Sequence, residues 1–215
     1  MLHFNLIYIC FMRHAAKQKL IDEVVVLQLG YPFRGSIQAT PAGTVRVVQM
    51  RDTDPETGVN WSDTVRTELP GRKQADWLRE GDILFASRGS RFYAVCLGMP
   101  PLSAVCSPQF FHLRVNPGGG VLPAFLAWQI NQPPFQRQLL QAAEGSNQLS
   151  IRMSVFAGLT INVPSLADQR RVAALADMAR QERSALRRLI RTREQQLESI
   201  AEHLAIAPRT TTEIQ

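Results

Sequence analysis

Two short polar loops carry the side chains of this chain that are best suited to chemistry. Residues 81–90 read Gly-Asp-Ile-Leu-Phe-Ala-Ser-Arg-Gly-Ser, and residues 144–150 read Glu-Gly-Ser-Asn-Gln-Leu-Ser. Neither loop holds a complete catalytic group. Arginine can donate two hydrogen bonds to guanine, however, and asparagine or glutamine amides fit the adenine edge. The residue types therefore favour nucleic-acid recognition.

The candidate DNA-contacting residues are polar or cationic side chains on or beside predicted loops. They are Arg34, Arg51, Ser87, Arg88, Ser90, Arg91, Tyr93, Asn147, Gln148 and Arg152. Serine and tyrosine hydroxyls in this set can bond to bases or phosphates. The alternative is that Gly89 and Gly145 only form turns and that the polar residues around them are ordinary surface.

The patterns that would indicate catalysis are each incomplete. Residues 131–135, Asn-Gln-Pro-Pro-Phe, resemble the Asn-Pro-Pro-Phe box of amino-methyltransferases, but Gln132 is inserted and no glycine-rich cofactor loop precedes the box. We interpret this segment as a helix break. The acidic residues Asp52, Asp54 and Glu56 have no lysine at nuclease spacing, and the histidines are scattered. We therefore expect no catalytic residue and no metal site.

The charge of the chain favours a polyanionic partner. The formal net charge is +6, and between Ile83 and Pro164 the single acidic residue is Glu144. The same stretch holds five arginines, which are Arg88, Arg91, Arg114, Arg137 and Arg152. A basic surface raises the local concentration of nucleic acid and speeds its capture.

The cysteines indicate a reducing compartment. Cys10, Cys96 and Cys106 are odd in number and irregularly spaced, with no Cys-x-x-Cys motif. This favours reduced thiols of a cytoplasmic protein over a disulfide framework or a zinc site.

The apolar start of the chain is too short to cross a bilayer and lacks a basic leader and a cleavage site. We therefore expect no membrane segment. Residues 1–11 are either a first strand or extra residues upstream of a start at Met12.

Runs of β-branched and apolar residues between glycines and prolines predict a mostly β domain. Strands are expected over residues 24–30, 44–50, 83–86, 92–97, 110–115 and 156–163, a loop over 51–58, and helices over 123–130 and 135–143. The expected fold class is α+β, with a mostly β domain and small helices over residues 1–164.

A long helix is predicted over residues 165–204. Ser165 and Asp168 match a capping box, and no glycine or proline follows before Leu204. Forty helical residues extend ~60 Å, whereas a domain of about 150 residues is less than ~40 Å across. A straight helix would therefore overhang its domain, and residues 205–215 would form a flexible tail.

An apolar stripe along this helix predicts a partner helix. The residues of the predicted interface are Val172, Leu175, Leu186, Leu189, Ile190, Leu197, Ile200 and Leu204. The alternative is a helical hairpin that turns near residues 191–193 and folds back on its own domain. The arginines beside the stripe alternate with glutamates and are also compatible with a solvated face.

The order of these elements resembles the specificity subunit of type I restriction-modification systems. The resemblance rests on Gly81-Asp82-Ile83-Leu84-Phe85 with Arg88-Gly89-Ser90, on Gly145-Ser146-x-Gln148, and on the strand 159–164 that leads into Ser165-Leu166-x-Asp168-Gln169. It covers about residues 24–204. It implies a target recognition domain over residues 1–164 that binds double-stranded DNA, followed by a coiled-coil-like helix that docks a methyltransferase subunit.

The resemblance also implies that the chain is not itself an enzyme. S-adenosylmethionine is expected on the partner methyltransferase, no cofactor is expected on this chain, and a restriction subunit is a possible further partner. The family usually carries two recognition domains and two long helices, whereas one of each is present here, and Asp168 stands where the family usually has Glu. This half-subunit form predicts a homodimer, or pairing with a second recognition subunit through the helix. The alternative function is an adaptor in a phage-defence complex that binds a methyltransferase without reading DNA.

Overall fold

The computed structural model describes residues 16–69, 74–145 and 148–206, and the chain divides into two compact units, Met1–Ala176 and Asp177–Gln215. Residues 1–11, expected to form a first strand or to be extra residues, lie outside the described residues. The tail predicted over residues 205–215 is wrong at its start, because the long helix continues to Ile206, and the rest of it lies outside the described residues. The boundary between the units falls inside the long helix, about three turns after the predicted domain boundary at residue 164.

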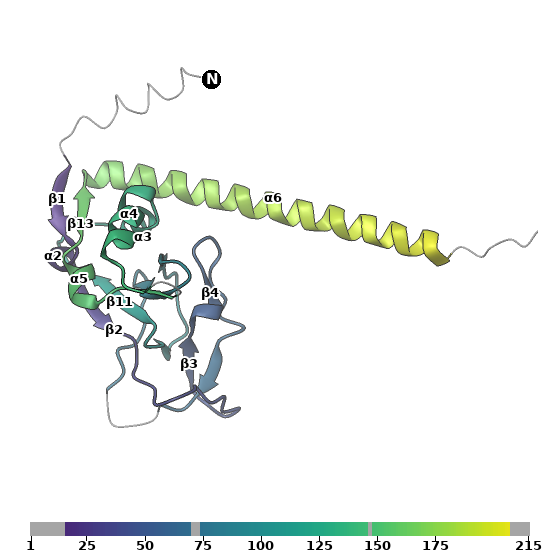
Figure 1. Cartoon of the computed structure of the whole chain (residues 1–215), viewed down its shortest axis with the longest axis horizontal. Coiled ribbons are helices and arrows are strands. Elements are labelled where there is room, and N and C mark those ends of the chain that lie inside the picture. Colours follow the sequence, from purple (N-terminus) through teal and green to yellow (C-terminus); the bar gives the residue numbers. More distant parts are fainter. Residues whose placement is uncertain (1–15, 70–73, 146–147, 207–215) are drawn as a thin grey trace, which may run out of the picture. The chain divides into compact units, whose positions relative to one another are not determined.

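The fold is α+β, as predicted, with a β-rich domain and a long C-terminal helix (Figure 1). The strands are β1 (Lys17–Leu20), β2 (Val25–Leu29), β3 (Val45–Val48), β4 (Thr53–Asp54), β5 (Gly58–Val59), β6 (Val65–Thr67), β7 (Ile83–Ala86), β8 (Arg88–Gly89), β9 (Tyr93–Cys96), β10 (Ala104–Cys106), β11 (Phe110–Val115), β12 (Leu149–Ser150) and β13 (Thr160–Val163). The helices are α2 (Ile21–Val24), the 3-10 helix η1 (Met50–Asp52), α3 (Pro123–Ile130), α4 (Pro133–Ala142), α5 (Met153–Ala157) and α6 (Leu166–Ile206).

Two sheets organise the first unit. The larger has the strand order β2-β11-β7-β9 and is antiparallel throughout. The smaller has the order β10-β3-β6, in which β10 runs parallel to β3. Because β7 lies inside the larger sheet and all four of its side chains are buried, it is a rigid element from which the following polar loop starts.

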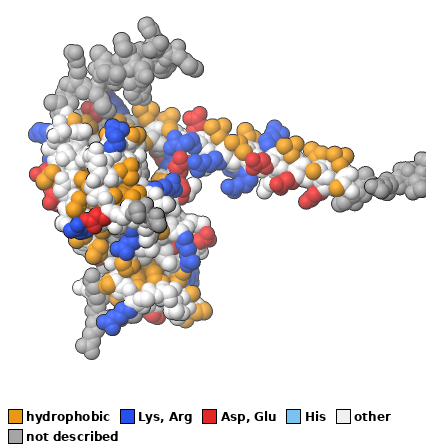
Figure 2. All heavy atoms as spheres, viewed as in Figure 1, with side chains coloured by type: hydrophobic (Ala, Val, Ile, Leu, Met, Phe, Trp, Pro, Cys, Tyr) orange, Lys and Arg blue, Asp and Glu red, His pale blue; other side chains and the backbone are white. Residues whose placement is uncertain are grey.

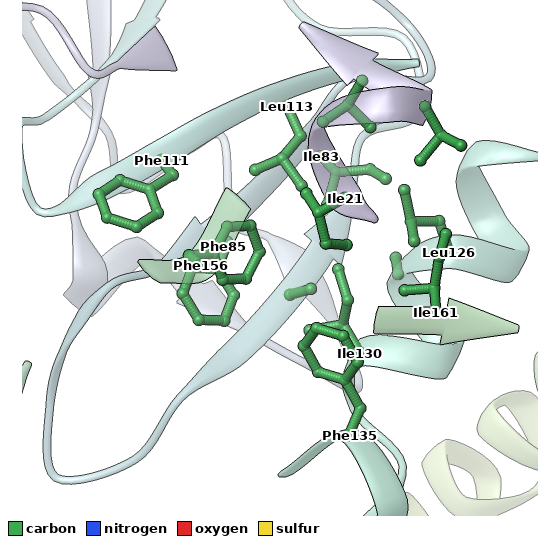
Figure 3. Packing of buried hydrophobic residues seen from close by; sticks show 14 of the residues in the cluster. Ile21, Ile83, Phe85, Phe111, Leu113, Leu126, Ile130, Phe135, Phe156 and Ile161 are labelled. Atoms are coloured by element: carbon green, nitrogen blue, oxygen red, sulfur yellow. The ribbon is translucent and has the colours of Figure 1, made fainter. Parts of the chain in front are cut away.

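The main core lies between the larger sheet and the short helices (Figure 3). Phe85 on β7 stacks on Phe156 on α5 with ring centroids 4.3 Å apart, and both side chains are fully buried. Leu126 and Ile130 of α3 and Leu139 of α4 are also fully buried. Burial of each such side chain contributes roughly 1.5–3 kcal/mol, so this cluster fixes the helices on the sheet.

The side chain of Asn131 closes the free edge of β9. Its Nδ2 donates to the Ala94 carbonyl at 2.8 Å, and its Oδ1 accepts from the Ala94 N–H at 2.8 Å. Asn131 also follows the last residue of α3, and α4 starts with Pro133 and Pro134. The interpretation of this segment as a helix break is therefore confirmed.

The strand predicted over residues 156–163 is wrong in its first half. Met153–Ala157 forms α5, and β13 begins only at Thr160. Phe156 enters the core from a helical turn, and a short apolar run in the sequence is the same for a helical turn and for a buried strand.

Two smaller differences concern residues 51–58 and Val24. The predicted loop over residues 51–58 contains the β4–β5 hairpin, and Val24, predicted to start a strand, is the last residue of α2. The other predicted strands and helices are confirmed within one to three residues at their ends.

The described cysteines are free thiols. Cys106 is buried, and burial raises the pKa of its thiol to about 12, so it stays protonated. Cys10 lies outside the described residues. No helix among the described residues has the length and apolar content needed to cross a bilayer.

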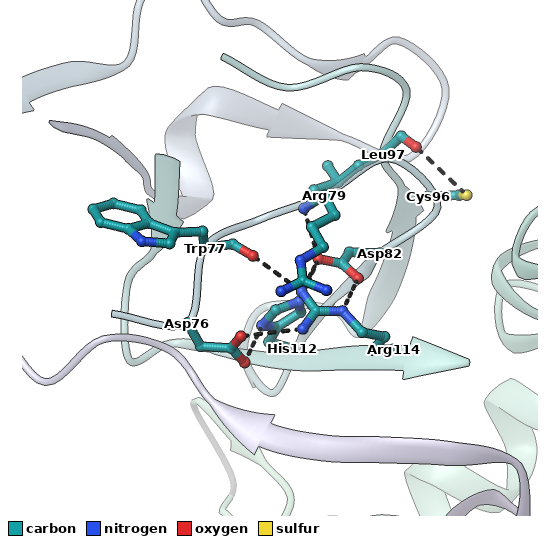
Figure 4. A network of polar contacts seen from close by, with 8 residues as sticks. All are labelled: Asp76, Trp77, Arg79, Asp82, Cys96, Leu97, His112 and Arg114. Atoms are coloured by element: carbon teal, nitrogen blue, oxygen red, sulfur yellow. Dashed lines mark hydrogen bonds and ion pairs between the residues drawn. The ribbon is translucent and has the colours of Figure 1, made fainter. Parts of the chain in front are cut away.

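A buried carboxylate fixes the start of β7 (Figure 4). Asp82, 1% exposed, accepts from Arg114 Nε at 2.8 Å and Nη2 at 2.7 Å, and its Oδ2 lies 2.7 Å from His112 Nε2. The Arg79 N–H donates to the same carboxylate at 2.8 Å. Asp76 contacts both His112 and Arg114 on their other side. The network ties the turn before β7 to β11.

We predict that Asp82 makes the stability of the fold depend on acid pH. Burial alone would raise the pKa of its carboxyl, but the hydrogen bonds from His112, Arg114 and the Arg79 N–H lower the pKa from its ordinary 3.8 to about 2. The stabilisation is present above the unfolded pKa and is lost as the pH falls through the folded pKa. The shift corresponds to about 2 kcal/mol.

The test is urea unfolding of the wild type and Asp82→Asn at neutral pH and at about pH 2. The variant should be less stable by about 2 kcal/mol or more at neutral pH, and the difference should shrink in acid. Glu80→Gln, at an exposed carboxylate, is the control. A difference that does not change with pH would contradict this role.

Candidate nucleic-acid interface

The two polar loops predicted from the sequence lie side by side in the structure. Strand β8 pairs with β12 in antiparallel register, with Ser150 opposite Arg88 and Leu149 opposite Gly89. The Ile151 N–H donates to the Ser87 carbonyl at 3.0 Å, which continues the contact. Segments about 60 residues apart in the chain therefore form one surface, here called the β8–β12 surface.

The β4–β5 hairpin is joined to this surface by a buried tyrosine. The Tyr93 hydroxyl lies 2.7 Å from Thr53 Oγ1, and Thr53 Oγ1 donates to the Met50 carbonyl at 3.0 Å. Asp54, on the hairpin, makes an ion pair with Arg91 at 3.5 Å. The hairpin is thus held against β9 and the segment that follows β8.

Seven of the predicted DNA-contacting residues are exposed. They are Arg34, Arg51, Arg88, Ser90, Arg91, Gln148 and Arg152. Arg88 is an exposed cation of β8 with no ion pair among the described residues. Arg34 lies on the loop between β2 and β3, and no hydrogen bond or ion pair of the described residues joins it to the β8–β12 surface. Asn147 lies outside the described residues.

Three of the exposed arginines lie beside carboxylates. Arg152 bonds to Glu144, Arg91 pairs with Asp54, and Arg51 Nε lies 3.6 Å from Asp52 Oδ1. The Arg91 guanidinium also lies 5.5 Å from the centre of the Tyr93 ring. These exposed pairs each contribute little to stability but restrict the arginine rotamers.

The paired arginines keep N–H groups for other acceptors. Hydrogen bonding to Arg152 lowers the pKa of the exposed Glu144 carboxyl, so this acid is ionised at neutral pH. A guanidinium carries five N–H donors, and Arg152 Nε and Nη2 both point at one carboxylate oxygen, Glu144 Oε1. Its remaining donors can reach another acceptor.

Ser87 and Tyr93 are buried, unlike the seven exposed residues named above. Ser87 is 3% exposed, and its Oγ donates to the Gln109 carbonyl at 2.9 Å. Tyr93 is 6% exposed, and burial raises the pKa of its hydroxyl. Because both hydroxyls have internal partners, we assign these residues to positioning the surface and not to contacting a ligand.

The side chain of Gln169 fixes the start of α6. In the sequence this residue was noted only as part of the motif after Ser165. Gln169 is fully buried, its Nε2 donates to the carbonyls of Gly120 at 2.8 Å and Pro164 at 2.9 Å, and its Oε1 accepts from the Leu122 N–H at 2.8 Å. A long amide at this depth with three partners is costly to replace. The available signal was a polar residue on the apolar side of the helix, four positions after the capping Ser165.

One half of the predicted capping box of α6 is confirmed, because the Ser165 hydroxyl accepts from the Asp168 N–H at 3.2 Å. The Asp168 carboxylate accepts from the Ser165 hydroxyl at 2.6 Å and not from a backbone amide, as the capping box predicted. One helix then runs without interruption to Ile206, so the alternative of a turn near residues 191–193 is wrong.

The apolar stripe of α6 is exposed over most of its length (Figure 2). Val172 is the exception, because it packs against the core of the first unit, and we assign it there and not to a partner interface. Leu175 is 46% exposed. The remaining predicted interface residues, Leu186, Leu189, Ile190, Leu197, Ile200 and Leu204, are 52–74% exposed.

Comparison with known proteins finds solved structures with a similar fold. No family model matches the chain, and no curated protein does. Among solved structures, the type I restriction-modification S subunit from M. genitalium matches with a TM-score of 0.56 and 15% identity over 87% of this chain and 45% of its own. The HsdS subunit from Thermoanaerobacter tengcongensis matches with a TM-score of 0.61 and 18% identity over 95% and 52%.

A third structure, of a type I R-M system described for its complex assembly and conformational transition, gives a TM-score of 0.62 and 17% identity over 93% and 48%. This chain shares the fold of these subunits. It spans about half the length of each. At this identity the similarity establishes the fold alone, and the half-subunit form stays a prediction. Groups of three or more residues able to hold a metal ion are absent from the described part of the chain.

We predict that Gly145 is required for the shape of the second polar loop. Its φ is +96°, and a Cβ there would lie 2.4 Å from the Gln148 carbonyl oxygen. Gly145→Ala should therefore destabilise the protein by about 1–3 kcal/mol. Gly35→Ala is the matched control, because its φ is +80° but a Cβ would meet nothing within 4 Å. Equal losses for the two variants in chemical denaturation would refute a steric requirement at Gly145.

Proposed function

We propose that this chain is the DNA-specificity component of a type I-like restriction-modification or DNA methyltransferase complex. In this role the first unit reads a short half-site in double-stranded DNA, and α6 docks a partner. The single observation that carries the proposal is the β8–β12 pairing, which joins both polar loops into one surface. The shared fold with S subunits supports the same role.

The chemistry of the β8–β12 surface suits base edges and phosphates together. Arg88 and the exposed Ser90 and Gln148 offer donors and acceptors for base readout. Arg91 and Arg152 are held in place by Asp54 and Glu144, and they retain donors for phosphate oxygens. In the proposed complex, a methyltransferase subunit supplies the reaction and binds its own S-adenosylmethionine.

The stripe of α6 supports a helical partner. Exposed leucines and isoleucines at helical spacing favour association, because a partner helix would remove them from water. The proposed assembly is a homodimer, or a pair with a second recognition subunit, together with the methyltransferase and in some complexes a restriction subunit. Two copies would bring two recognition units to one site. We place this assembly in the cytoplasm.

One observation favours the second candidate, an adaptor that binds a methyltransferase without reading DNA. Arg51, Arg91 and Arg152 each lie beside a carboxylate, which lowers the positive potential of the β8–β12 surface. The two candidates differ in duplex binding and in its dependence on salt.

Replacing Arg88, Arg91 and Arg152 with Ala should abolish specific duplex binding, because it removes the cationic donors of the β8–β12 surface. Counterion release makes log K fall with log salt by about 0.9 per phosphate contact, so residual binding should also depend less on salt. Fluorescence anisotropy with labelled duplexes at several salt concentrations measures both effects.

A matched triple variant controls for the change in net charge. Arg137, Arg170 and Arg188 are exposed and lie outside the β8–β12 surface, and their replacement with Ala should leave specific binding intact. Wild-type binding by the first variant would eliminate the base-reading role of these arginines. No duplex binding by the wild-type protein would favour the adaptor.

Changing Leu186, Leu189 and Leu197 to Asp should reduce the native assembly to monomers, because three charges would lie in the apolar seam. Light scattering of the purified protein gives the mass. Asp at Ser184, Gln195 and Ser199, on the opposite side of α6, adds the same charge away from the seam and should leave the mass unchanged. An unchanged mass for the leucine variant would refute pairing through this stripe.

A further inference from the structure

A second basic feature lies on the smaller sheet, outside the β8–β12 surface. A cavity of about 500 Å³ opens between the turn Pro41–Thr44 and the segment Pro101–Ser103. Arg46 on β3 and Arg66 on β6 also line it. None of these residues was expected from the sequence to bind a ligand.

The walls of the cavity are fixed by backbone hydrogen bonds. The Arg46 N–H donates to the Ser103 carbonyl at 2.9 Å, and the Thr40 N–H donates to the Arg66 carbonyl at 2.8 Å. Gly43 packs directly on β6, since a Cβ there would lie 2.6 Å from the Thr67 backbone. These contacts therefore hold both lining loops against the sheet.

The two arginines face each other across neighbouring strands. Arg46 is the register partner of Arg66 in the antiparallel β3–β6 pair. Directly opposed side chains have Cβ atoms about 4.5–5.5 Å apart, and like charges in such pairs destabilise a sheet. An anion between the two guanidinium groups would reverse this effect.

The hydrogen bonds of the two side chains leave donors for an anion. Arg46 Nη1 donates to the Trp61 carbonyl at 2.6 Å and to Thr64 Oγ1 at 3.0 Å, and both acceptors are neutral. Arg66 is exposed, and among the described residues it has no hydrogen bond from its side chain and no ion pair. One carboxylate reaches the rim, where Glu68 Oε1 accepts from the Thr44 N–H at 3.0 Å.

We propose that this cavity binds a phosphate group, held between Arg46 and Arg66. A guanidinium group can donate two parallel hydrogen bonds to two oxygens of one phosphate. The positive charges of the two arginines also favour a phosphate over a neutral ligand. The source that fits the proposed function is a backbone phosphate of the bound DNA. Strand β3 leads from the cavity toward Met50, four residues or ~13 Å away, and a Cβ on Gly89 of β8 would lie 2.8 Å from Met50 Cε.

In this arrangement the cavity holds the duplex backbone and the β8–β12 surface meets the bases. The inference that the phosphate comes from DNA rests on the proposed function. The inference that the cavity binds phosphate rests on Arg46 and Arg66 alone.

The first experiment measures duplex binding by Arg66→Ala over a range of salt. Loss of one phosphate contact should lower the slope of log K against log salt by about 0.9, which corresponds to about fivefold weaker binding at 0.15 M salt. The order of preference among duplex sequences should not change, because phosphate contacts carry no base information. Arg66→Lys keeps the charge and should retain most of the slope, and Arg137→Ala is the control outside the cavity.

The second experiment titrates inorganic phosphate at low ionic strength, using isothermal calorimetry on the wild type and Arg66→Ala. Saturable binding by the wild type that is lost in the variant supports the site. Arg66 is exposed, so the variant should keep its fold, which thermal unfolding checks.

The two experiments separate the two proposals. Phosphate binding that depends on Arg66, without duplex binding by the wild type, would keep the cavity site, assign it to another phosphate-bearing molecule and refute the proposed function. Duplex binding with an unchanged slope in Arg66→Ala, together with no phosphate binding that depends on Arg66, would refute the cavity site and leave the proposed function standing.

Discussion

The position of the polar loops depends on the buried carboxylate of Asp82. It joins the turn before β7 to His112 and Arg114 on β11, and the two strands then pair along their length. Strand β7 ends where Ser87 bonds to Gln109 and to Ile151, and this last contact leads into β12. The strands that position the exposed arginines are thus held together by the buried ion pair between Asp82 and Arg114. A buried carboxylate is tolerated there because each of its oxygens has partners.

The sequence predicted the elements whose signals are local. Ile83–Ala86 is a continuous apolar run after a glycine, and Ser165 with Asp168 is a cap, so β7 and the start of α6 were both predicted. The pairing of β8 with β12 was not predicted, because strands of two residues have no periodicity and their contact spans about 60 residues. Phe156 was assigned to a strand because a short apolar run fits a helical turn equally well.

The candidate site was predicted in part. Exposed arginines at 88, 91 and 152 follow from polar loop sequences, but the burial of Ser87 and Tyr93 depends on which neighbours cover them. Ion pairs such as Arg152 with Glu144 arise because the turn at β12 brings residues eight apart into contact. The opposition of Arg46 and Arg66 likewise follows from strand register, which composition does not encode. In this account a buried ion pair stabilises the framework, and exposed arginines lie on two surfaces.

The most direct test is selection of duplexes from a random-sequence pool by the untagged native complex, followed by sequencing of the bound DNA. The account predicts enrichment of one short sequence, in two copies if two chains pair, and loss of that enrichment when Arg88, Arg91 and Arg152 are changed to Ala. Binding without enrichment of any sequence, or no binding by the intact complex, would contradict the claim that this chain specifies a DNA site.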